Sequence, residues 1–340
     1  MKLQDIYSDS VPQLLEDFAA APPVQRLKEV GMNCGCEYTK LPPFCRMNAY
    51  YSRYDHSIGC ARIVWEQMRR AQRDGAYETA SASVAALLHD IATPVFAHTV
   101  DFLNGDYEKQ ESTEDGTKRI IHESAELQEL LHRYGLREEA VWDYHCFPIA
   151  DNEPPRLSAD RLEYTLSNGV HYGILSFGEA EELYEDLAVG INEEGKAEIL
   201  FRNPDPAIAF TETALACGAV YISDEDRYAM QRLADILREA LQAGVLTQAD
   251  LYGREPQIIA RLQGARQTRK AWEEYCSCRR VVRAKARPAE GDWLKVKAKK
   301  RWINPLIAGM GRVTEVSEET KQKIQAFLAL DLDVWLRGQS

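Results

Sequence analysis

The run ASASVAALLHD at residues 80–90 limits most strongly how this chain can fold. Its first nine residues carry no charge, which predicts a helix over residues 78–89 that is buried on most sides. The run ends on a histidine and an aspartate, His89 and Asp90. Because a carboxylate is rarely buried unless it is paired or bound to a metal, Asp90 needs a partner in the fold.

Most of the chain has helical periodicity, so the expected fold is mainly α. An amphipathic helix is expected over residues 57–73, and a longer one over 113–134. A long helical region is expected over 205–243, with Gly218 as its candidate break, and a closing helix over 318–336. Shorter helices are expected at residues 11–18, 23–30, 94–103, 158–167 and 179–187.

Two segments depart from this helical pattern. Residues 187–191 and 197–202 flank the turn NEEG, and residues 281–287 and 293–301 alternate apolar with basic side chains. Both patterns are typical of β-hairpins. The expected organisation is therefore a helical core over residues 1–175 and a C-terminal helical region over 176–340. This second region carries the two small hairpins and packs on the core.

The charge of the chain is unevenly distributed. The net charge of −12 argues against general nucleic-acid binding, but residues 266–301 contain 13 lysines or arginines and only 4 acidic residues. This basic segment could meet a polyphosphate, a nucleic acid or an acidic face of a second subunit in a homo-oligomer. A solvated pair of strands explains it equally well.

The sequence shows neither a membrane span nor a secretory signal, since no apolar run is long enough and the N-terminus is acidic. Eight cysteines in 340 residues do not indicate a disulfide scaffold, and those at 34, 36 and 45 lack a fourth zinc ligand at a usual interval. The cytoplasm is the expected compartment.

A metal site follows from combining His89 and Asp90 with groups elsewhere. A second imidazole from the preceding helix and a carboxylate from a later one would give two nitrogen and two oxygen donors. That mixed set, completed by water, suits Mn²⁺, Fe²⁺, Zn²⁺, Ni²⁺ or Mg²⁺ rather than a structural thiolate site. Taken alone, each residue is more commonly a helix-ending aspartate or a hydrogen-bonded core histidine, so spacing leaves both interpretations open.

A set of motifs in a fixed order resembles the HD-domain phosphohydrolases, nearest their deoxynucleoside triphosphate triphosphohydrolase branch. The similarity covers roughly residues 20–175. The order of the motifs, the residues that flank them and most of the spacings between them agree with the family. The motifs are RYDHSIG at 53–59, LLHDIATPVFAH at 87–98 followed by Asp101, HE at 122–123 and DRLEY at 160–164.

The resemblance implies one divalent metal ion held by His56, His89, Asp90 and Asp160. Such an ion polarises a phosphoryl oxygen and makes its bound water more acidic, so that hydroxide can attack near neutral pH.

The resemblance also implies roles for residues around the metal. Arg53 would reach a phosphate, since a guanidinium fork suits that contact. His98 would protonate the leaving oxygen, with Asp101 holding its imidazole in orientation. His122 and Glu123 would line the same cleft and contact the phosphate or the activated water.

Two positions depart from the family pattern. Thr93 replaces a histidine that contacts a phosphate in the triphosphohydrolases, and Asn168 replaces an aspartate that reads the sugar hydroxyl. Asn168 can still bind a hydroxyl, and Tyr164, one helical turn beyond Asp160, is expected to face the same cavity. His145 has no motif around it; it could line a cleft, but a position at the surface or in the core is the favoured expectation.

The expected activity is metal-dependent hydrolysis of a phosphate ester or anhydride of a nucleotide-like molecule, with a deoxynucleoside triphosphate as leading candidate. A phosphomonoesterase acting on a nucleoside monophosphate or another small phosphate is the alternative within enzymes. A nucleotide-sensing or nucleic-acid-binding module with an inactive HD site is the alternative outside them.

Overall fold

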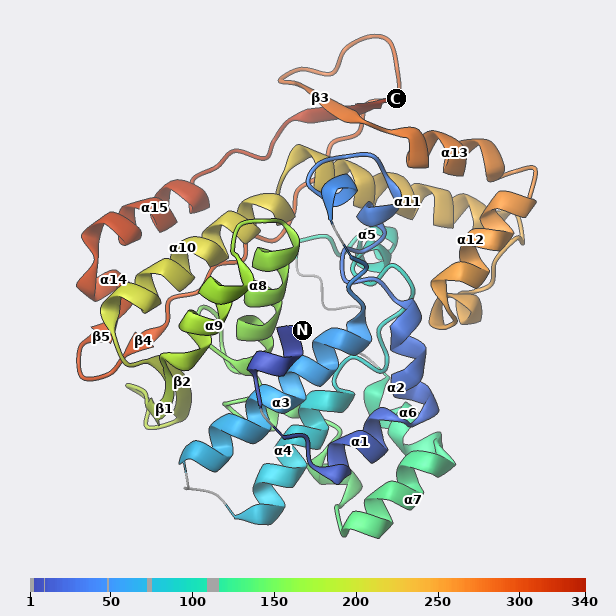
Figure 1. Ribbon diagram of the computed structural model, residues 1–340. Coiled ribbons are helices and arrows are strands. Elements are labelled where there is room, and N and C mark those ends of the chain that lie inside the picture. Colours follow the sequence, from blue (N-terminus) through green and yellow to red (C-terminus); the bar gives the residue numbers. More distant parts are fainter. Residues whose placement is uncertain (1–2, 9, 48, 72–74, 109–115) are drawn as a thin grey trace.

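The computed structural model describes residues 3–8, 10–47, 49–71, 75–108 and 116–340 (Figure 1). The fold is mainly α, as expected from the sequence. The first part of the chain supplies these helices: α1 (Gln13–Ala19), α2 (Pro22–Arg26), α3 (Arg53–Ala71), α4 (Ala76–Leu88), α5 (Thr99–Asn104), α6 (Thr117–Glu123), α7 (Ala125–Tyr134) and α8 (Ala159–His171).

The later part of the chain adds helices and two small sheets. Its helices are α9 (Phe177–Glu185), α10 (Pro204–Tyr221), α11 (Asp224–Gln242), α12 (Glu255–Gly264), α13 (Arg269–Ser277), α14 (Val313–Val316) and α15 (Glu318–Leu328). Its strands are β1 (Leu187–Ile191), β2 (Ala197–Phe201), β3 (Arg280–Ala284), β4 (Leu306–Ile307), β5 (Gly311–Arg312) and β6 (Trp335–Gln339).

Helices α3, α4 and α8 form the framework of the site. The run of alanine, serine and leucine makes α4 apolar on most sides, and its side chains from residue 81 to 88 are all buried. Helix α3 begins where Ser52 and Asp55 exchange hydrogen bonds between side chain and backbone N–H, which is the pattern of a capping box. Helix α8 begins at Ser158, whose hydroxyl accepts from the N–H of Arg161. These starting points place polar residues in the first turns of α3 and α8.

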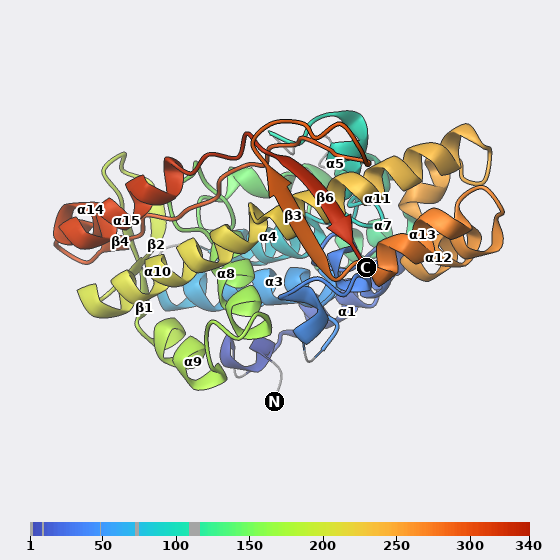
Figure 2. The ribbon, with the colours of Figure 1, turned by 90° about the horizontal axis from the view of Figure 1, so that it is seen from above.

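Helices α10 and α11 lie across this framework, and α11 is covered on its far side by the β3–β6 pair (Figure 2). The chain turns by 46° between them, at Ile222 and Ser223 rather than at Gly218. The hydroxyl of Ser223 caps α11 by accepting from the N–H of Asp226. Gly218 serves instead as a point of close approach, because a Cβ there would lie 2.7 Å from the carbonyl oxygen of Arg301.

The first predicted hairpin is confirmed, and the second is wrong. Strands β1 and β2 pair antiparallel, and β2 continues the sheet through β4 to β5. Strand β3 pairs with the C-terminal strand β6 instead of with residues 293–301, of which Leu294 alone forms an isolated bridge to Leu336. Pro288 and Gly291 lie in the intervening loop, and the strand that completes the sheet comes from more than fifty residues away.

The closing helix and the long helix predicted over 113–134 differ from the expectation. The closing helix stops at Leu328, so the last part of residues 318–336 is irregular chain leading into β6. The helix predicted over 113–134 is divided at Ser124, whose hydroxyl accepts from Leu127 N–H and starts α7. The first three residues of that prediction lie outside the described residues.

The apolar core does not separate at residue 175. One buried cluster joins side chains of α3, α4 and α8 to those of α9, β2 and α10. A second joins residues near Cys36 and Phe96 to α11, α12 and α13. The division into two portions stays a prediction. No single described helix has the length and apolar composition of a membrane span, and α10 with α11 reaches them only as a bent pair.

Candidate metal centre and its cavity

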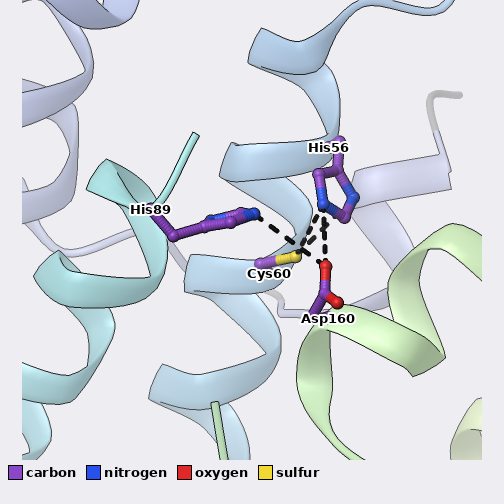
Figure 3. A group of neighbouring side chains, drawn as sticks. All are labelled: His56, Cys60, His89 and Asp160. Atoms are coloured by element: carbon purple, nitrogen blue, oxygen red, sulfur yellow. Dashed lines mark hydrogen bonds and ion pairs between the residues drawn. The ribbon is translucent and has the colours of Figure 1, made fainter. Parts of the chain in front are cut away.

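Donor atoms from three helices meet beside the end of α4. His56 lies in the first turn of α3, His89 directly follows α4, and Asp160 lies in the first turn of α8. Oδ1 of Asp160 lies 3.0 Å from Nε2 of His56 and 3.9 Å from Nε2 of His89 (Figure 3). Oδ2 of Asp90 lies 4.0 Å from the first of these nitrogens and 3.6 Å from the second. The four residues predicted as ligands are thus gathered around one point.

Both imidazoles are held by their other nitrogen. Nδ1 of His89 lies 2.7 Å from the carbonyl oxygen of Ala86, so it carries the proton and donates it there. Nδ1 of His56 lies 2.5 Å from Oε2 of Glu163. In both rings this leaves the lone pair of Nε2 directed at the shared point, as a metal ligand requires.

Sequence reasoning did not single out Glu163, the partner of His56, although it lies inside the DRLEY motif. Its side chain is fully buried, and the Tyr51 hydroxyl donates to its other oxygen. Gly59 on α3 makes room for it, because a Cβ at that position would lie 2.6 Å from Cγ of Glu163. The Gly in RYDHSIG and the Glu in DRLEY are therefore complementary, a relation that only the packing of α3 on α8 reveals.

Asp90 is fixed on the opposite side of the centre by two donors. Nη1 of Arg53 donates to Oδ2 at 3.0 Å, and the hydroxyl of Thr93 donates to Oδ1 at 2.7 Å. Burial alone would raise the pKa of Asp90, but Arg53, His89 and His56 hold it well below its usual value. Arg53, predicted to reach a phosphate, lines the cavity and is bonded to this carboxylate.

The donor set fits a divalent cation. Asp90, Asp160 and Glu163 bring three carboxylates to a largely buried place, and the charge of Arg53 balances one of them. Burial lowers the pKa of His56, yet the net shift is upward, because the Cys60 sulfur and the Asp160 and Glu163 carboxylates surround it. Such an excess of acceptors and negative charge is what a bound cation relieves.

The sulfur of Cys60 lies within 4.8 Å of donor atoms of His56, His89 and Asp160, but its position relative to the His56 ring does not suit a ligand of the same ion. Its Sγ is 3.7 Å from both Nδ1 and Nε2 of His56. A ligand that shared a metal ion with Nε2 would be nearer to Nε2 than to Nδ1, because imidazole binds metals through an in-plane lone pair. The thiol therefore packs against the ring of His56, and Asp90 is the better fourth donor.

His98 and Asp101 form a pair at the edge of the same cavity. Nδ1 of His98 lies 2.8 Å from Oδ2 of Asp101, whose side chain is fully buried. The pKa of His98 is lowered by burial, and the hydrogen bond to Asp101 opposes this shift only in part. The pair leaves Nε2 of His98 as the nitrogen available for proton transfer.

His122 and Glu123 are placed differently from the prediction. The side chain of His122 is 74% exposed, with Nδ1 3.3 Å from an oxygen of Glu138, and Glu123 is also exposed. Neither is among the described residues that line the cavity. Both lie at the end of α6, whose first turn, at Thr117 and Lys118, is the part that faces the cavity.

The cavity beside the metal centre has a volume of about 450 Å³, which is the size of pocket that takes a small organic ligand. Tyr164 and Asn168, two residues of α8 that were predicted to face the substrate, line this cavity. His145, expected at the surface or in the core, lines it too, with a half-exposed side chain. Tyr172, which follows α8, also lines it, and sequence reasoning missed several other lining residues, among them Asn33, Tyr144, Tyr221, Asp226, Lys299 and Arg301.

The end of the basic segment contributes to this cavity. Lys299 and Arg301 line it, so part of residues 266–301 is directed at the site rather than at a separate surface. Tyr144, which lies outside this segment, also lines the cavity, and its ring stacks on His89 with 4.8 Å between the ring centroids. The positive charge of the segment was visible in the sequence, whereas its position in the fold, with the carbonyl oxygen of Arg301 close to Gly218 on α10, is a result of tertiary packing.

Comparisons with known proteins extend this description. No protein-family model matches the sequence. The chain is 24% identical over 272 residues to the uncharacterized protein YdhJ of Bacillus subtilis, covering 78% of this chain and 76% of that one. It is 27% identical over 191 residues to the metal-dependent phosphohydrolase cns2 of Cordyceps militaris, covering 54% of this chain and 49% of cns2. That match therefore spans about half of the fungal protein.

The fold comparison covers the whole molecule. The structure of a phosphohydrolase from Bacteroides thetaiotaomicron superposes with a TM-score of 0.63 at 13% sequence identity, and the match covers 97% of this chain and 96% of that one. The similarity includes the C-terminal portion, for which the sequence offered little resemblance. The chain thus shares the mainly α fold of that protein over nearly its full length.

Proposed function

We propose that this protein is a metal-dependent phosphohydrolase of the HD type, which cleaves a phosphate ester or anhydride. The observation that carries the proposal is the meeting of His56, His89, Asp90 and Asp160 around one point, at the wall of a cavity that also contains His98. The name of the fungal relative, a metal-dependent phosphohydrolase, and the fold shared with a bacterial phosphohydrolase support the same chemistry.

The four residues would hold one divalent ion, with Mn²⁺, Fe²⁺, Zn²⁺, Ni²⁺ and Mg²⁺ as candidates. When bound, the ion would supply Lewis-acid polarisation of a phosphoryl oxygen and a more acidic water molecule. Glu163 and the Ala86 carbonyl would keep the two imidazoles in the tautomer that binds metal.

The residues around the centre would bind the phosphate and move the proton. Arg53, Lys299 and Arg301 bring positive charge to the cavity and would attract the phosphate. His98 would give a proton from Nε2 to the leaving oxygen, while Asp101 keeps Nδ1 protonated and the ring in place. Because burial lowers the pKa of His98, this proton is released more readily than from a free imidazole.

The substrate would be nucleotide-like, with a deoxynucleoside triphosphate as the leading candidate from the resemblance of the motifs. One observation favours a phosphomonoester as the second candidate. Thr93 stands where the triphosphohydrolases have a phosphate-contacting histidine, and its hydroxyl is engaged with Asp90. A cationic contact for a further phosphate is therefore missing at this position.

The test is a hydrolysis screen on protein stripped of metal and reloaded with each candidate ion. Substrates are para-nitrophenyl phosphate and nucleoside mono- and triphosphates, and the released phosphate, pyrophosphate or tripolyphosphate is identified. His98→Ala is expected to lower kcat by about two to four orders of magnitude while the bound metal is unchanged. His132→Ala, at an exposed position on α7, is the matched control and should retain full activity.

Two outcomes would contradict this proposal. If the wild-type protein hydrolyses nothing with any of the ions, yet binds nucleotides, the chain is a sensor with an inactive site. If His98→Ala retains activity, the reaction does not use the proton on this imidazole.

A further inference from the structure

The cavity extends well beyond the metal centre, along α8. Asp160, Tyr164 and Asn168 line it at successive turns of this helix. At a rise of 1.5 Å per residue, Asn168 lies about 12 Å along the helix from Asp160. We call the portion around Asn168, Tyr172, Tyr221 and Asp226 the far end of the cavity. A ligand whose phosphate lies at the metal centre would place its organic part here.

The far end contains a buried acceptor without a partner. Asn168 is 5% exposed, and its Nδ2 donates to the hydroxyl of Tyr221 at 2.8 Å. Its Oδ1 makes no hydrogen bond to any described residue. An unpaired buried carbonyl destabilises a fold by about 1–3 kcal/mol, so a group held there by a ligand would be favoured.

Asp226 is the second unusual group at the far end. It is the third residue of α11, where an acidic side chain ordinarily bonds back to the N–H of the capping residue. The pattern recurs in this protein: Asp55 accepts from Ser52 N–H, Glu179 accepts from Ser176 N–H, and Asp250 accepts from Thr247 N–H at the start of a short 3-10 helix. In the described chain Asp226 does not, although the hydroxyl of Ser223 caps α11.

The carboxyl of Asp226 faces the cavity instead. It is 8% exposed, and in the described chain it accepts a hydrogen bond from the thiol of Cys36, a weak donor at 3.8 Å. Burial raises the pKa of Asp226 to about 8, so the group is largely neutral at neutral pH. A neutral carboxyl presents an O–H donor and a C=O acceptor side by side, like an amide.

We propose that the far end is a nucleobase subsite, in which Asp226 pairs through its donor and acceptor with an amide-like edge of the base and thereby determines specificity. This inference rests on the proposed phosphohydrolase function and names the substrate class of the same site. Met230, one turn beyond Asp226 on α11, and the rings of Tyr172 and Tyr221 line the same end and suit a flat, weakly polar ring.

A further phosphate is a poor occupant of the far end. Its oxygens would face the unpaired carbonyl oxygen of Asn168, which does not bind anions, although the charge of Arg301 also acts at Tyr221. A nucleobase carries hydrogen-bond donors that Asn168 Oδ1 can accept and an edge that Asp226 can pair. The phosphate belongs at the metal centre, where Arg53 supplies positive charge.

The test compares substrates with and without a base in Asp226 variants. The metal-loaded protein is assayed on para-nitrophenyl phosphate and on adenosine, guanosine, cytidine and uridine mono- and triphosphates. Asp226→Ala should lower kcat/KM for the preferred nucleotide by about tenfold or more, mainly through KM, with less than about a twofold effect on the aryl phosphate. Asp226→Asn keeps a neutral donor and acceptor and should stay within about threefold of wild type on the nucleotide.

The controls separate the possible failures. Asp235→Ala lies on α11 with its carboxylate bonded to Arg238 and Gln231, and should match wild type on both substrates. Asp226→Leu, which keeps the branching and the number of side-chain heavy atoms, replaces the alanine variant if that protein does not fold. Unchanged aryl phosphate hydrolysis also shows that the metal centre is intact.

Two results with Asp226→Ala would overturn the inference: equal losses of kcat/KM on the nucleotide and the aryl phosphate, or no loss on nucleotides. It would also be overturned if Asp226→Asn were as impaired as Asp226→Ala. A fourth contrary result is a wild-type protein that hydrolyses nucleotides no better than the aryl phosphate. Each leaves the phosphohydrolase function standing. That function fails separately, if the wild-type protein does not hydrolyse the aryl phosphate or any nucleotide with any ion.

Discussion

The two ends of the cavity differ in how fully their polar groups are paired. At the metal centre each imidazole has its outer nitrogen bonded, and Asp90 accepts from Arg53 and Thr93. At the far end, in the described chain, Asn168 retains an oxygen without a hydrogen bond, and Asp226 accepts from a thiol. The protein itself fixes the geometry of the metal donors, whereas it leaves hydrogen-bonding capacity at the far end for a ligand.

This difference follows from what each end must do. Metal donors have to be in place before the ion arrives, because a ligand even slightly misplaced weakens binding and catalysis. A subsite for the organic part of a substrate gains selectivity when its buried polar groups are left unpaired by the wrong molecule. Substitutions at one end should therefore leave the properties of the other unchanged.

The largest expected effect comes from Asp160→Ala. The variant should lose metal binding and, with it, at least about three orders of magnitude in kcat/KM. In the wild-type protein, metal at a hundredfold excess over its Kd should stabilise the fold by about 2.7 kcal/mol, and this gain should vanish in the variant. Thermal unfolding with and without metal measures it, and Asp205→Ala, exposed on α10, serves as control.

The sign of the stability change in the metal-free protein is also informative. Because Asp160 adds negative charge to a buried group of carboxylates, metal-free Asp160→Ala should melt no lower than metal-free wild type. A clearly lower melting temperature would mean that Asp160 holds α8 in place rather than serving the ion.

The second effect is a pH dependence that originates at the far end. The pKa of Asp226 is raised by burial from an ordinary 3.8 to about 8, so the folded protein keeps a proton that the unfolded chain releases. The stability that this group contributes is fully present below roughly pH 4 and is lost as pH rises toward the folded pKa. Asp226→Asn removes this dependence.

The comparison is made by unfolding metal-free protein at a series of pH values. The variant should gain stability over wild type as pH rises from roughly 4 to 8, by on the order of 2–5 kcal/mol in total. Asp235→Asn should follow the wild-type curve. Parallel curves for Asp226→Asn and wild type would show that the carboxyl is ionised in the folded protein.

Glu163→Gln tests the pairing at the metal centre. The amide keeps the size of the side chain but loses the charge that supports His56, so metal affinity should fall by about ten- to a hundredfold. Metal titration followed by calorimetry measures this, with Glu182→Gln, exposed on α9, as the matched control. An unchanged affinity would mean that Tyr51 and the packing alone orient the imidazole.

Much of the fold was readable from the sequence because helices leave a local signal. The apolar run of α4, the stripe of α3 and the hairpin of β1 and β2 each depend on nearby residues. The partner of β3 could not be predicted in the same way, because β6 lies more than fifty residues further on and its pairing is a tertiary choice. The break at Ser124 did have a local signal, because a serine can cap a helix. The regular spacing of apolar residues across residues 113–134 nevertheless predicted one continuous helix.

The two ends of the cavity differ again in how far the sequence predicts them. The metal donors lie in motifs with recognisable neighbours, and the structure brings those four residues together. Asp226 lies in the segment SDEDRYAM, which looks like any acidic start of a helix. Its difference from Glu179 and Asp250 consists only of the direction of its side chain, which depends on the packing of α11 near Cys36.

The smallest expected effect is that of His122→Ala. This variant tests whether His122 lies in the cleft or in solvent. The resemblance of the motifs places His122 in the cleft, whereas the structure places its ring in solvent near Glu138. An exposed pair of this kind contributes little to stability or function, so the variant should keep kcat and KM within about twofold of wild type. A loss as large as that of His98→Ala would mean that α6 turns toward the metal centre when substrate binds. The cavity would then have a third wall that closes over the phosphate, and the contrast between its two ends would describe only the open form.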